Sequence, residues 1–287
     1  MLALLKSPSA PLQTKQGSKQ TGSIVLVKTP SRIFKQVKAN RLSQYQKGFY
    51  QICPRVRDPY SRREKARKIL QLLIQYAGFP LSSAACLDVG CSSGIISYTL
   101  APFFQTVVGL EYDETALCAA DPDVRKHVQF VLGDAMHLPF KDDAFEVIIC
   151  AQVYEHVPDD RRLFDEIHRV LKGGGVVFFS GPNWLFPIEP HYRWPFLHWL
   201  PLRLADAILR FTGLGTHYYE RSRSFWSLRR LMRSFVILDV SKEVIVMKFS
   251  GSKLGKLLQR LPETFWRIAS PFYPNFNWIL KKGSDSD

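Results

Sequence analysis

Residues 84–94 of the chain, Ala-Ala-Cys-Leu-Asp-Val-Gly-Cys-Ser-Ser-Gly, decide how the rest of the sequence is interpreted. The first half is short and apolar, which predicts a buried strand, and Gly90 and Gly94 predict a tight turn into a helix over residues 95–100. Glycine has no Cβ and adopts positive φ, so such a turn lets backbone N–H groups approach a ligand closely. The D-x-G-x-x-x-G spacing that starts at Asp88 differs from the G-x-G-x-x-G dinucleotide motif and from the phosphate-binding P-loop.

A second apolar run, residues 106–110, ends in the triplet Glu111-Tyr112-Asp113. In nucleotide-binding sheets, an acidic residue at the end of the second strand accepts hydrogen bonds from ribose hydroxyls, about 20 residues after the first turn. Glu111 follows Asp88 by 23 residues, which fits that spacing. We therefore expect Glu111 to bind the ribose of a nucleoside.

A third run, residues 127–132, is followed by the sequence GDAM at residues 133–136. Asp134 is then placed to accept a hydrogen bond from an exocyclic amine such as that of adenine. Met136 is expected to pack on the base. The third strand therefore adds the remaining part of a nucleoside site.

Strands and helices continue to alternate after this point. We predict a fourth strand over residues 145–150, a helix over 160–171 and a fifth strand over 176–180. This alternation through short glycine-containing turns predicts a doubly wound parallel sheet, whose ligands bind at the C-terminal ends of the strands. The candidate ligand-binding positions share that location: Gly90, Glu111, Asp134 and Gln152.

Four segments resemble the class I S-adenosylmethionine-dependent methyltransferases, most closely the branch of quinone-biosynthesis and other small-molecule enzymes. These are LDVGCSSG (87–94), VVGLEYDETAL (107–117), GDAMHLPFKDDAFEVIICAQVYEHVPD (133–159) and FDEIHRVLKGGGVVFFSGPN (164–183). The resemblance implies an α/β fold with a doubly wound, mostly parallel, seven-stranded Rossmann-like sheet and an antiparallel edge strand. It also implies S-adenosyl-L-methionine as the cofactor.

The same resemblance implies which residues bind the cofactor. Residues 88–94 would hold its methionine part, Glu111 the ribose and residues 134–136 the adenine, and Ala151-Gln152 would line the methionine side. One departure is Cys91-Ser92-Ser93, where the family often has a further glycine; serine is small enough that we expect binding to survive. The full set is Asp88, Gly90, Cys91, Gly94, Glu111, Tyr112, Asp134, Ala135, Met136, Ala151 and Gln152.

The positive charge of the chain lies outside this core. The net charge is +14, and residues 1–80 carry 16 Lys and Arg against 2 Asp and Glu, whereas residues 81–190 carry 7 against 16. Such flanks point to contact with a partner rather than to a requirement of the fold. Residues 1–45 contain no acid, and we expect a mostly disordered tail with a short strand at 23–27. A solvated tail without a specific role and an organelle transit peptide both remain open.

The sequence after residue 183 predicts an acceptor-binding part. All six tryptophans lie at or beyond Trp184, and five prolines between residues 182 and 201 exclude one regular element, which favours a lid folded over the cofactor site. We predict helices at 202–211 and 225–235, and sheet-closing strands at 236–240 and 244–248. The aromatic and cationic residues there, and in the segment 257–276, fit an apolar acceptor pocket, ordinary core packing or an anionic membrane surface.

These patterns divide the chain into six parts. An amphipathic helix over residues 61–78 belongs to a cover that, by resemblance, lies over the cofactor. The parts are a basic tail (1–45), a helical cover (46–80), the cofactor-binding core (81–183), the acceptor lid (184–222), a helix with closing strands (223–250) and an aromatic C-terminal extension (251–287).

No apolar run approaches the roughly 18 residues needed to cross a bilayer, and the first residues are too short for a secretory signal. The five cysteines form no C-x-x-C pair, which favours reduced thiols and argues against a structural zinc site. We therefore expect a cytoplasmic protein, with peripheral membrane contact as an option. The oligomeric state stays open.

Methyl transfer to a hydroxyl needs a base, because a free hydroxyl carries little negative charge at neutral pH. Histidine is the side chain most easily tuned for that task. We rank His156 first, because it follows the fourth strand, then His191 in the lid and His217 in the later turn. A role for His156 in orienting a loop remains open, as does a divalent ion held by Glu155 and His156, although two adjacent ligands predict no metal site by themselves.

Three functions remain at this point. The first is methyl transfer to an oxygen of a small or lipid-linked acceptor. The second is a nucleic-acid methyltransferase that uses the basic N-terminal residues, although the loop AQVYEH at residues 151–156 differs from the N-P-P-Y type of base-amino methyltransferases. The third is a catalytically silent methyltransferase fold that acts as an adaptor. The acceptor itself is not encoded in a recognisable motif.

Overall fold

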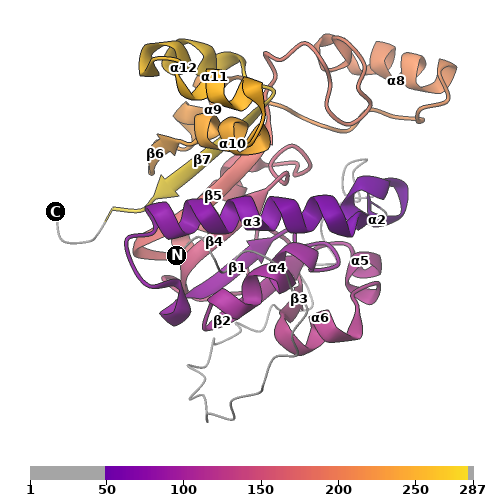
Figure 1. Cartoon of the computed structure of the whole chain (residues 1–287). Coiled ribbons are helices and arrows are strands. Elements are labelled where there is room, and N and C mark those ends of the chain that lie inside the picture. The colour runs from indigo at the N-terminus through magenta and orange to yellow at the C-terminus, as the bar shows by residue number, and fades with distance from the viewer. Residues whose placement is uncertain (1–48, 284–287) are drawn as a thin grey trace.

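The fold is organised around one seven-stranded sheet, shown in Figure 1 for the computed structural model of the chain. The structure describes residues 49–283, so the predicted tail over residues 1–45 and its short strand lie outside the described residues. The strand order is β3-β2-β1-β4-β5-β7-β6. The bounds are β1 Ala85–Val89, β2 Thr106–Glu111, β3 Gln129–Leu132, β4 Phe145–Ala151, β5 Leu171–Pro182, β6 Val236–Asp239 and β7 Asn275–Lys281.

The first five strands are parallel, and β7 runs antiparallel between β5 and β6. The register aligns the C-terminal ends: Val89 of β1 lies opposite Leu110 of β2 and Cys150 of β4. The predicted doubly wound, mostly parallel sheet with antiparallel pairing at one edge is confirmed. This alignment is what gathers the candidate site residues along one side of the sheet.

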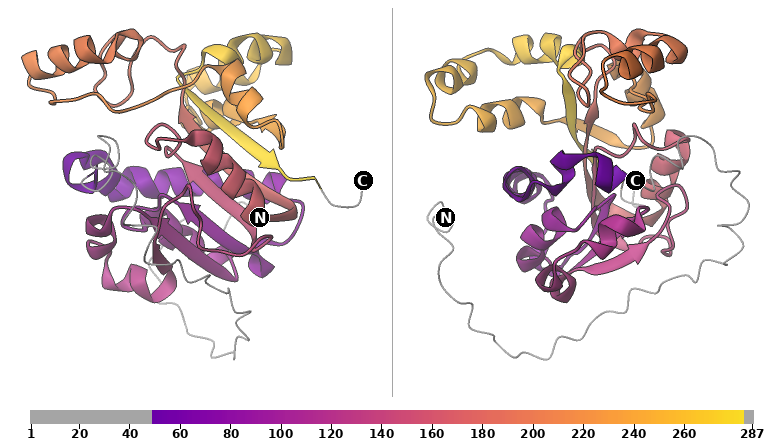
Figure 2. Two further views of the ribbon diagram at one scale, coloured as in Figure 1. Left: turned by 180° about the vertical axis from the view of Figure 1, so that it is seen from behind. Right: turned by 90° about the vertical axis from the view of Figure 1, so that its right-hand side faces the viewer.

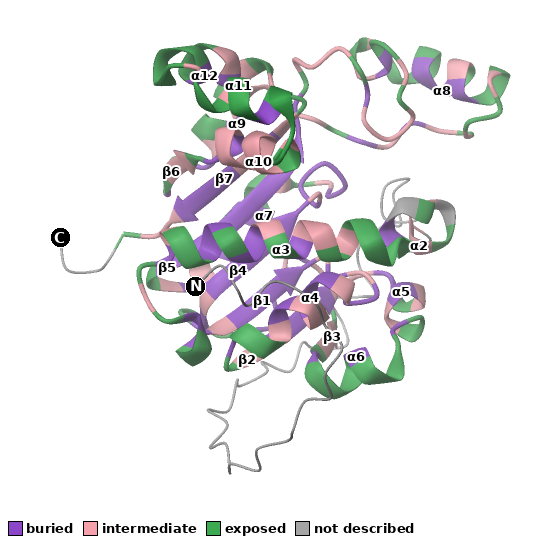
Figure 3. Ribbon diagram, in the orientation of Figure 1, coloured by how far each residue is buried: buried purple, intermediate pink, exposed green. Residues whose placement is uncertain are grey.

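Helices cover both faces of the sheet (Figures 1 and 2). The helices of the described residues are α2 Phe49–Ile52, α3 Pro59–Tyr76, α4 Ile95–Leu100, α5 Glu114–Cys118, α6 Pro122–His127, α7 Asp160–Val170, α8 Leu202–Phe211, α9 Phe225–Leu231, α10 Ser241–Lys248, α11 Lys253–Gln259 and α12 Glu263–Ala269. Apolar residues of α3, α4 and α10 pack on one face, and those of α7 and α9 pack on the other. The sheet is therefore buried on both sides, as Figure 3 shows.

Strand β4 illustrates how the sequence specifies this arrangement. Val147 and Ile149 belong to the cluster under α3, whereas Ile148 and Cys150 belong to the cluster under α7. Successive side chains of a strand point to opposite faces, so a strand covered on both sides is apolar at consecutive positions, here residues 147–151, after the partly buried Glu146. The uninterrupted apolar run in the sequence is the signature of that double burial.

Two sequence predictions about the last part of the sheet are wrong. The predicted strand at residues 244–248 is α10, and the strand next to β5 is β7, in a region assigned to the C-terminal extension. Residues 244–247 favour a strand locally because two of the four are valines and one is isoleucine. Packing overrides that preference, since Val244 and Met247, one helical turn apart, both contact the cluster on the α3 face. In β7 it is the alternation of Phe276, Trp278 and Leu280 that marks the buried side.

The chain between β5 and α9 leaves the sheet and projects away from it, as Figures 1 and 2 show. We call residues 183–224 the lid segment. Its start is held by Asn183, whose side-chain amide donates to the carbonyl oxygens of Pro271 and Tyr273, each at 2.8 Å. Its own small core consists of Leu197, Ala205, Leu209 and Tyr218. The lid segment is thus fixed at its start by the hydrogen bonds of Asn183, and it has a small hydrophobic core separate from the two clusters that cover the sheet.

Two further findings concern the described residues as a whole. None of the helices within residues 49–283 combines the length and the apolar character that crossing a membrane requires. All five cysteines lie in this range, and none of them forms a disulfide. The second finding agrees with the prediction of free thiols.

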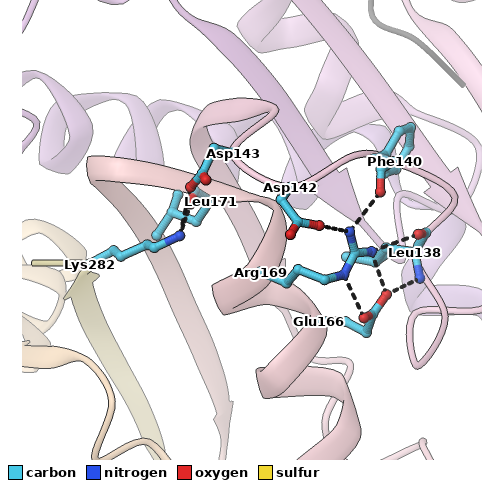
Figure 4. A network of polar contacts seen from close by, with 8 residues as sticks. All are labelled: Leu138, Phe140, Asp142, Asp143, Glu166, Arg169, Leu171 and Lys282. Atoms are coloured by element: carbon cyan, nitrogen blue, oxygen red, sulfur yellow. Dashed lines mark hydrogen bonds and ion pairs between the residues drawn. The ribbon is translucent and has the colours of Figure 1, made fainter. Parts of the chain in front are cut away.

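A polar network fixes the loop between β3 and β4 to α7, as Figure 4 shows. Arg169 donates to the carboxylate of Glu166 at 2.8 Å, to that of Asp142 at 2.7 Å, and to the carbonyl oxygens of Phe140 and Leu138 at 2.8 and 3.0 Å. Glu166 in turn accepts from the backbone N–H of Leu138 at 2.7 Å. The guanidinium of Arg169 therefore provides hydrogen-bond donors for the carbonyl oxygens of Leu138 and Phe140, which have no other partner within this network.

Replacing Arg169 with alanine is expected to lower the free energy of unfolding by about 1–3 kcal/mol, because partly buried acceptors lose a charged donor. Urea unfolding followed by circular dichroism measures the change. Arg161→Ala is the matched control, since Arg161 is an exposed arginine on the same helix. Equal stability of the two variants would show that the network contributes nothing measurable.

Candidate active site

A cavity of about 390 Å³ lies at the C-terminal ends of β1 to β4. It is lined by residues that follow these strands, by α2 and α3 from the N-terminal side, and by Pro190 and His191 from the lid segment. Elements far apart in the sequence therefore meet around one space. A ligand at the strand ends would contact the sheet, the N-terminal helices and the lid segment at once.

Most of the predicted cofactor-binding residues line this cavity. They are Gly90, Glu111, Tyr112, Asp134, Ala135, Ala151 and Gln152. Of the other four, Asp88 and Cys91 are buried, Gly94 begins α4 and Met136 packs against the core. The structure thus brings seven of the predicted residues to the cavity surface and places four behind it.

The turn after β1 needs glycine at two positions. Gly90 has φ +70°, and a Cβ there would lie 2.7 Å from Cγ2 of Val153. Gly94 has φ +77°, and its Cβ would lie 2.4 Å from the ring of Phe130. Both positions therefore combine a left-handed backbone with close packing, which only glycine accommodates without displacement. The predicted tight glycine turn is therefore present, with positive φ at both glycines.

Asp88 and Glu111 hold the turn from two sides. Asp88 is buried and accepts a hydrogen bond from the hydroxyl of Ser97 at 2.6 Å, and burial raises the pKa of its carboxyl to about 6. Glu111 accepts from the backbone N–H groups of Ser92 at 2.8 Å, Tyr112 at 2.7 Å and Asp113 at 3.0 Å. Burial raises the pKa of Glu111, and these N–H donors oppose that shift. Glu111 therefore connects the turn after β1 to the end of β2.

The ends of β3 and β4 complete this side of the cavity. Asp134 accepts from the N–H of Met136 at 2.8 Å through one carboxylate oxygen. Gln152 has φ +65°, a conformation that is rare for a residue with a side chain. Its N–H donates to the carbonyl oxygen of Ser180 at 2.7 Å, and its amide donates to the hydroxyl of the same residue at 3.3 Å. These contacts to β5 hold the left-handed conformation.

Two cations of α3 also line the cavity, and the sequence analysis did not assign them to the site. Arg62 and Lys65 lie one helical turn apart and are half-buried. Burial lowers the pKa of Arg62, and burial together with the charge of Arg62 lowers that of Lys65 to about 8. Neither side chain forms an ion pair within residues 49–283. The i, i+3 spacing on an amphipathic helix was the available signal.

The two highest-ranked histidines meet at the lid side of the cavity. The rings of His156 and His191 are 5.2 Å apart, and Phe49 of α2 packs on His156 at 4.7 Å. Burial and the positive charge of His191 lower the pKa of His156 well below its usual range. Burial opposes the charge of His191, but the hydrogen bond to Glu189 at 2.8 Å and the nearby Glu220 raise its pKa to about 9. At neutral pH the pair therefore consists of a neutral and a charged imidazole.

The third histidine is not part of this arrangement. His217 contacts the hydroxyl of Thr216 at 3.0 Å and is not among the residues that line the cavity. Glu155, next to His156, is fully buried, its carboxylate oxygens make no hydrogen bond within the described part of the chain, and burial raises the pKa of this carboxyl to about 7. Ligand atoms of Glu155, His156 and His191 lie within 4.8 Å of one another, so the structure adds His191 as a third ligand to the Glu155–His156 pair that the sequence left open for a divalent ion.

Comparison with known proteins agrees with this geometry. A family model described as a methyltransferase domain matches residues 87–179. A ubiquinone biosynthesis O-methyltransferase of Thiobacillus denitrificans is 30% identical over 191 residues, which are 64% of this chain and 78% of that protein. An uncharacterised methyltransferase of Mycobacterium leprae is 31% identical over 170 residues, and a ubiquinone biosynthesis O-methyltransferase of Pseudomonas entomophila is 31% identical over 150. The match spans 63% and 59% of the length of these two relatives, respectively, and 49% of this chain.

Among solved structures, the PH0226 protein of Pyrococcus horikoshii aligns with a TM-score of 0.53 at 17% identity, covering 82% of this chain and 99% of that one. This likeness supports the fold. The chain belongs to the class I S-adenosylmethionine-dependent methyltransferases, and its cofactor is S-adenosylmethionine. The cavity fits that cofactor, because it offers a glycine turn for close backbone approach and two cations without an ion-pair partner among the described residues.

Replacing Gly90 with alanine is expected to weaken S-adenosylmethionine binding by about tenfold or more, since the new Cβ both strains the backbone and displaces Val153, which lines the cavity. Isothermal titration calorimetry measures the affinity. Gly174→Ala is the matched control, because Gly174 has φ +73° but nothing within 4 Å of a Cβ. Unchanged affinity in Gly90→Ala would show that the close approach of the turn is not needed for binding.

Proposed function

We propose that this methyltransferase moves the methyl group of S-adenosylmethionine to an oxygen of a small or lipid-linked acceptor, with His156 as the general base. The observation that carries the proposal is the position and state of His156, which lines the cavity next to the end of β4 and is neutral at physiological pH. Two of the relatives named above are O-methyltransferases, which supports an oxygen acceptor. A neutral imidazole can accept the proton that such an acceptor must lose.

The bound cofactor supplies a methyl group on a positively charged sulfur. In the proposal, Glu111 accepts hydrogen bonds from the ribose hydroxyls and Asp134 accepts from the adenine amine. Arg62 and Lys65 bind the carboxylate of the methionine part. Asp88 acts through the turn, because it is buried behind Gly90 and contacts Ser97. These contacts orient the cofactor and keep water out of the cavity.

On the acceptor side, the hydroxyl donates its proton to His156 as the oxygen attacks. Nε2 of His156 lies 3.8 Å from a carboxylate oxygen of Glu155, which stabilises the imidazolium formed there to the extent that this carboxyl, with its pKa raised to about 7, is ionised. His191 is held as a cation by Glu189 and lies on the same side of the cavity, where its charge stabilises a developing oxyanion. The lid segment therefore contributes an electrostatic group, while the core contributes the base.

The test is transfer of a radiolabelled methyl group from S-adenosylmethionine to matched aromatic acceptors, catechol and an alkylated catechol on one side and o-phenylenediamine on the other. We expect methylation of the catechols and none of the diamine. A short RNA serves as a third acceptor. Methylation of the RNA alone, or of the diamine in preference to the catechols, would contradict the proposal.

The pH dependence follows from the two histidines. A folded-state pKa well below the usual value keeps His156 neutral as the pH falls through about 6.5, so no loss of rate centred there is expected. The raised pKa of His191 means that its positive charge is lost as the pH rises through about 9, and the rate is expected to fall there. A rate profile of the wild type against His191→Gln measures this, and a fall above pH 9 that persists unchanged in His191→Gln would contradict the assignment.

A further inference from the structure

Helix α8 in the lid segment is apolar on two opposite sides. Ala205 and Leu209 are buried in the small core of the lid segment. Leu204 and Phe211 are seven positions apart, so they lie together on the opposite side, where they are 49% and 94% exposed. A surface helix of a soluble protein normally carries polar residues there. Figure 3 shows that α8 contains both buried and exposed residues.

The charges around this outward side are all positive. Between residues 190 and 219 the exposed charged residues are Arg193, Arg203 and Arg210. The single acid in that stretch, Asp206, is buried and accepts a hydrogen bond from the N–H of Tyr218 at 2.8 Å. Arg203 and Arg210 are also seven positions apart and therefore form a row next to Leu204 and Phe211. The surface combines exposed apolar side chains with a positive rim.

A second group of the same kind lies on α11 and α12. Its exposed apolar residues are Leu254, Leu257, Phe265 and Ile268, and its exposed cations, Lys253, Lys256, Arg260 and Arg267, outnumber its one exposed acid, Glu263, which pairs with Lys242. Figures 1 and 2 place α8 and the pair α11 and α12 at the same end of the molecule, on either side of the sheet. Two separate elements therefore present the same chemistry at that end.

We propose that this end of the molecule docks on an anionic lipid surface, with Leu204 and Phe211 at the depth of the headgroups and Arg203 and Arg210 on lipid phosphates. Interfacial helices bind membranes through buried apolar area combined with attraction to anionic lipids. A second copy of the chain fits less well, because an isologous contact would bring the arginine rows together. If the proposed function holds, docking also brings His191, at the lid side of the cavity, close to a lipid-linked acceptor.

The experiment is co-sedimentation of the full chain with vesicles of phosphatidylcholine alone and of phosphatidylcholine mixed with phosphatidylglycerol. We expect binding to the mixed vesicles that weakens as salt is raised. The double variant Leu204→Ser/Phe211→Ser is expected to bind at least about tenfold more weakly, because two apolar side chains no longer insert. Phe103→Ser is the control, since Phe103 in the short 3-10 helix Ala101–Phe103 is also exposed but lies on the core.

A second pair of variants tests the charge. Arg203→Glu/Arg210→Glu is expected to remove the preference for the anionic vesicles, whereas Lys141→Glu, an exposed cation on the core, leaves it in place. The basic N-terminal residues are present in every variant, so binding through them would leave all variants equal and would overturn the proposal. So would a wild type that ignores vesicles, or one that forms dimers which Leu204→Ser/Phe211→Ser dissociates. Methyl transfer to a water-soluble catechol stays unchanged in these variants, which separates this proposal from the proposed function.

Discussion

Replacing His156 with alanine is expected to lower the rate of methyl transfer by about 10²- to 10⁴-fold, which is the usual contribution of a positioned general base. The affinity for S-adenosylmethionine should change little, because His156 lies on the lid side of the cavity and the residues proposed to bind the cofactor lie at the ends of β1 to β3 and on α3. Single-turnover transfer measures the first quantity and calorimetry the second. A loss of rate without a loss of cofactor affinity is the signature of the proposed role.

The controls separate a catalytic role from a structural one. His217→Ala should retain full activity, because His217 does not line the cavity. His156→Gln keeps a polar side chain next to Phe49 and should fold as the wild type does, with thermal unfolding as the check. If His156→Gln retains the wild-type rate while His191→Gln loses it, the base has been assigned to the wrong histidine.

Replacing Glu111 with alanine is expected to weaken cofactor binding by about 10- to 100-fold, because hydrogen bonds to a charged group contribute about 1.5–3 kcal/mol. The loss has two sources in the structure. The proposed bonds to the ribose disappear, and the N–H group of Ser92 loses its acceptor, so the turn after β1 is less well held. Calorimetric titration with S-adenosylmethionine measures the sum of both effects.

Separate titrations with adenosine and with methionine distinguish the lost ribose contact from the displaced turn. Loss of the ribose contact weakens adenosine selectively, whereas a displaced turn weakens both fragments. Glu114→Ala is the control, since Glu114 is an exposed acid three residues further along. An unchanged affinity for adenosine in Glu111→Ala would remove Glu111 from the proposed ribose site.

The core of the fold could be predicted from the sequence because its signals are local. Each of the strands β1 to β5 is an apolar run bounded by glycine or acidic residues, and parallel pairing then brings the ends together. Of the seven cavity-lining residues named in advance, Gly90, Glu111, Asp134 and Gln152 follow from this rule, and the other three came from the family resemblance. Four others, such as Asp88, lie behind the surface, because a spacing rule identifies the loop but not which side chains face the ligand.

The remaining features depend on contacts between distant parts of the chain. The helical state of Ser241–Lys248 is set by packing of Val244 and Met247 on the sheet, which the local preference of these residues opposes. The raised pKa of His191 depends partly on Glu189, two residues before it, and partly on Glu220, which only the fold brings near. Arg62 and Lys65 join the site only because α3 crosses the strand ends. A short stretch of sequence cannot predict contacts that form only when the chain is folded.

The place of β7 in the sheet has a consequence for synthesis on the ribosome. Residues 275–281 form β7, which pairs with β5 on one side and with β6 on the other. Until this late segment has been synthesised, the edge of β5, including Phe179, has no strand to pair with. The strands β1 to β5 can pair earlier, as they emerge. The nascent chain therefore exposes the unpaired backbone N–H and C=O groups of β5 while almost 100 further residues are translated. We expect the chain to depend on chaperones during this interval.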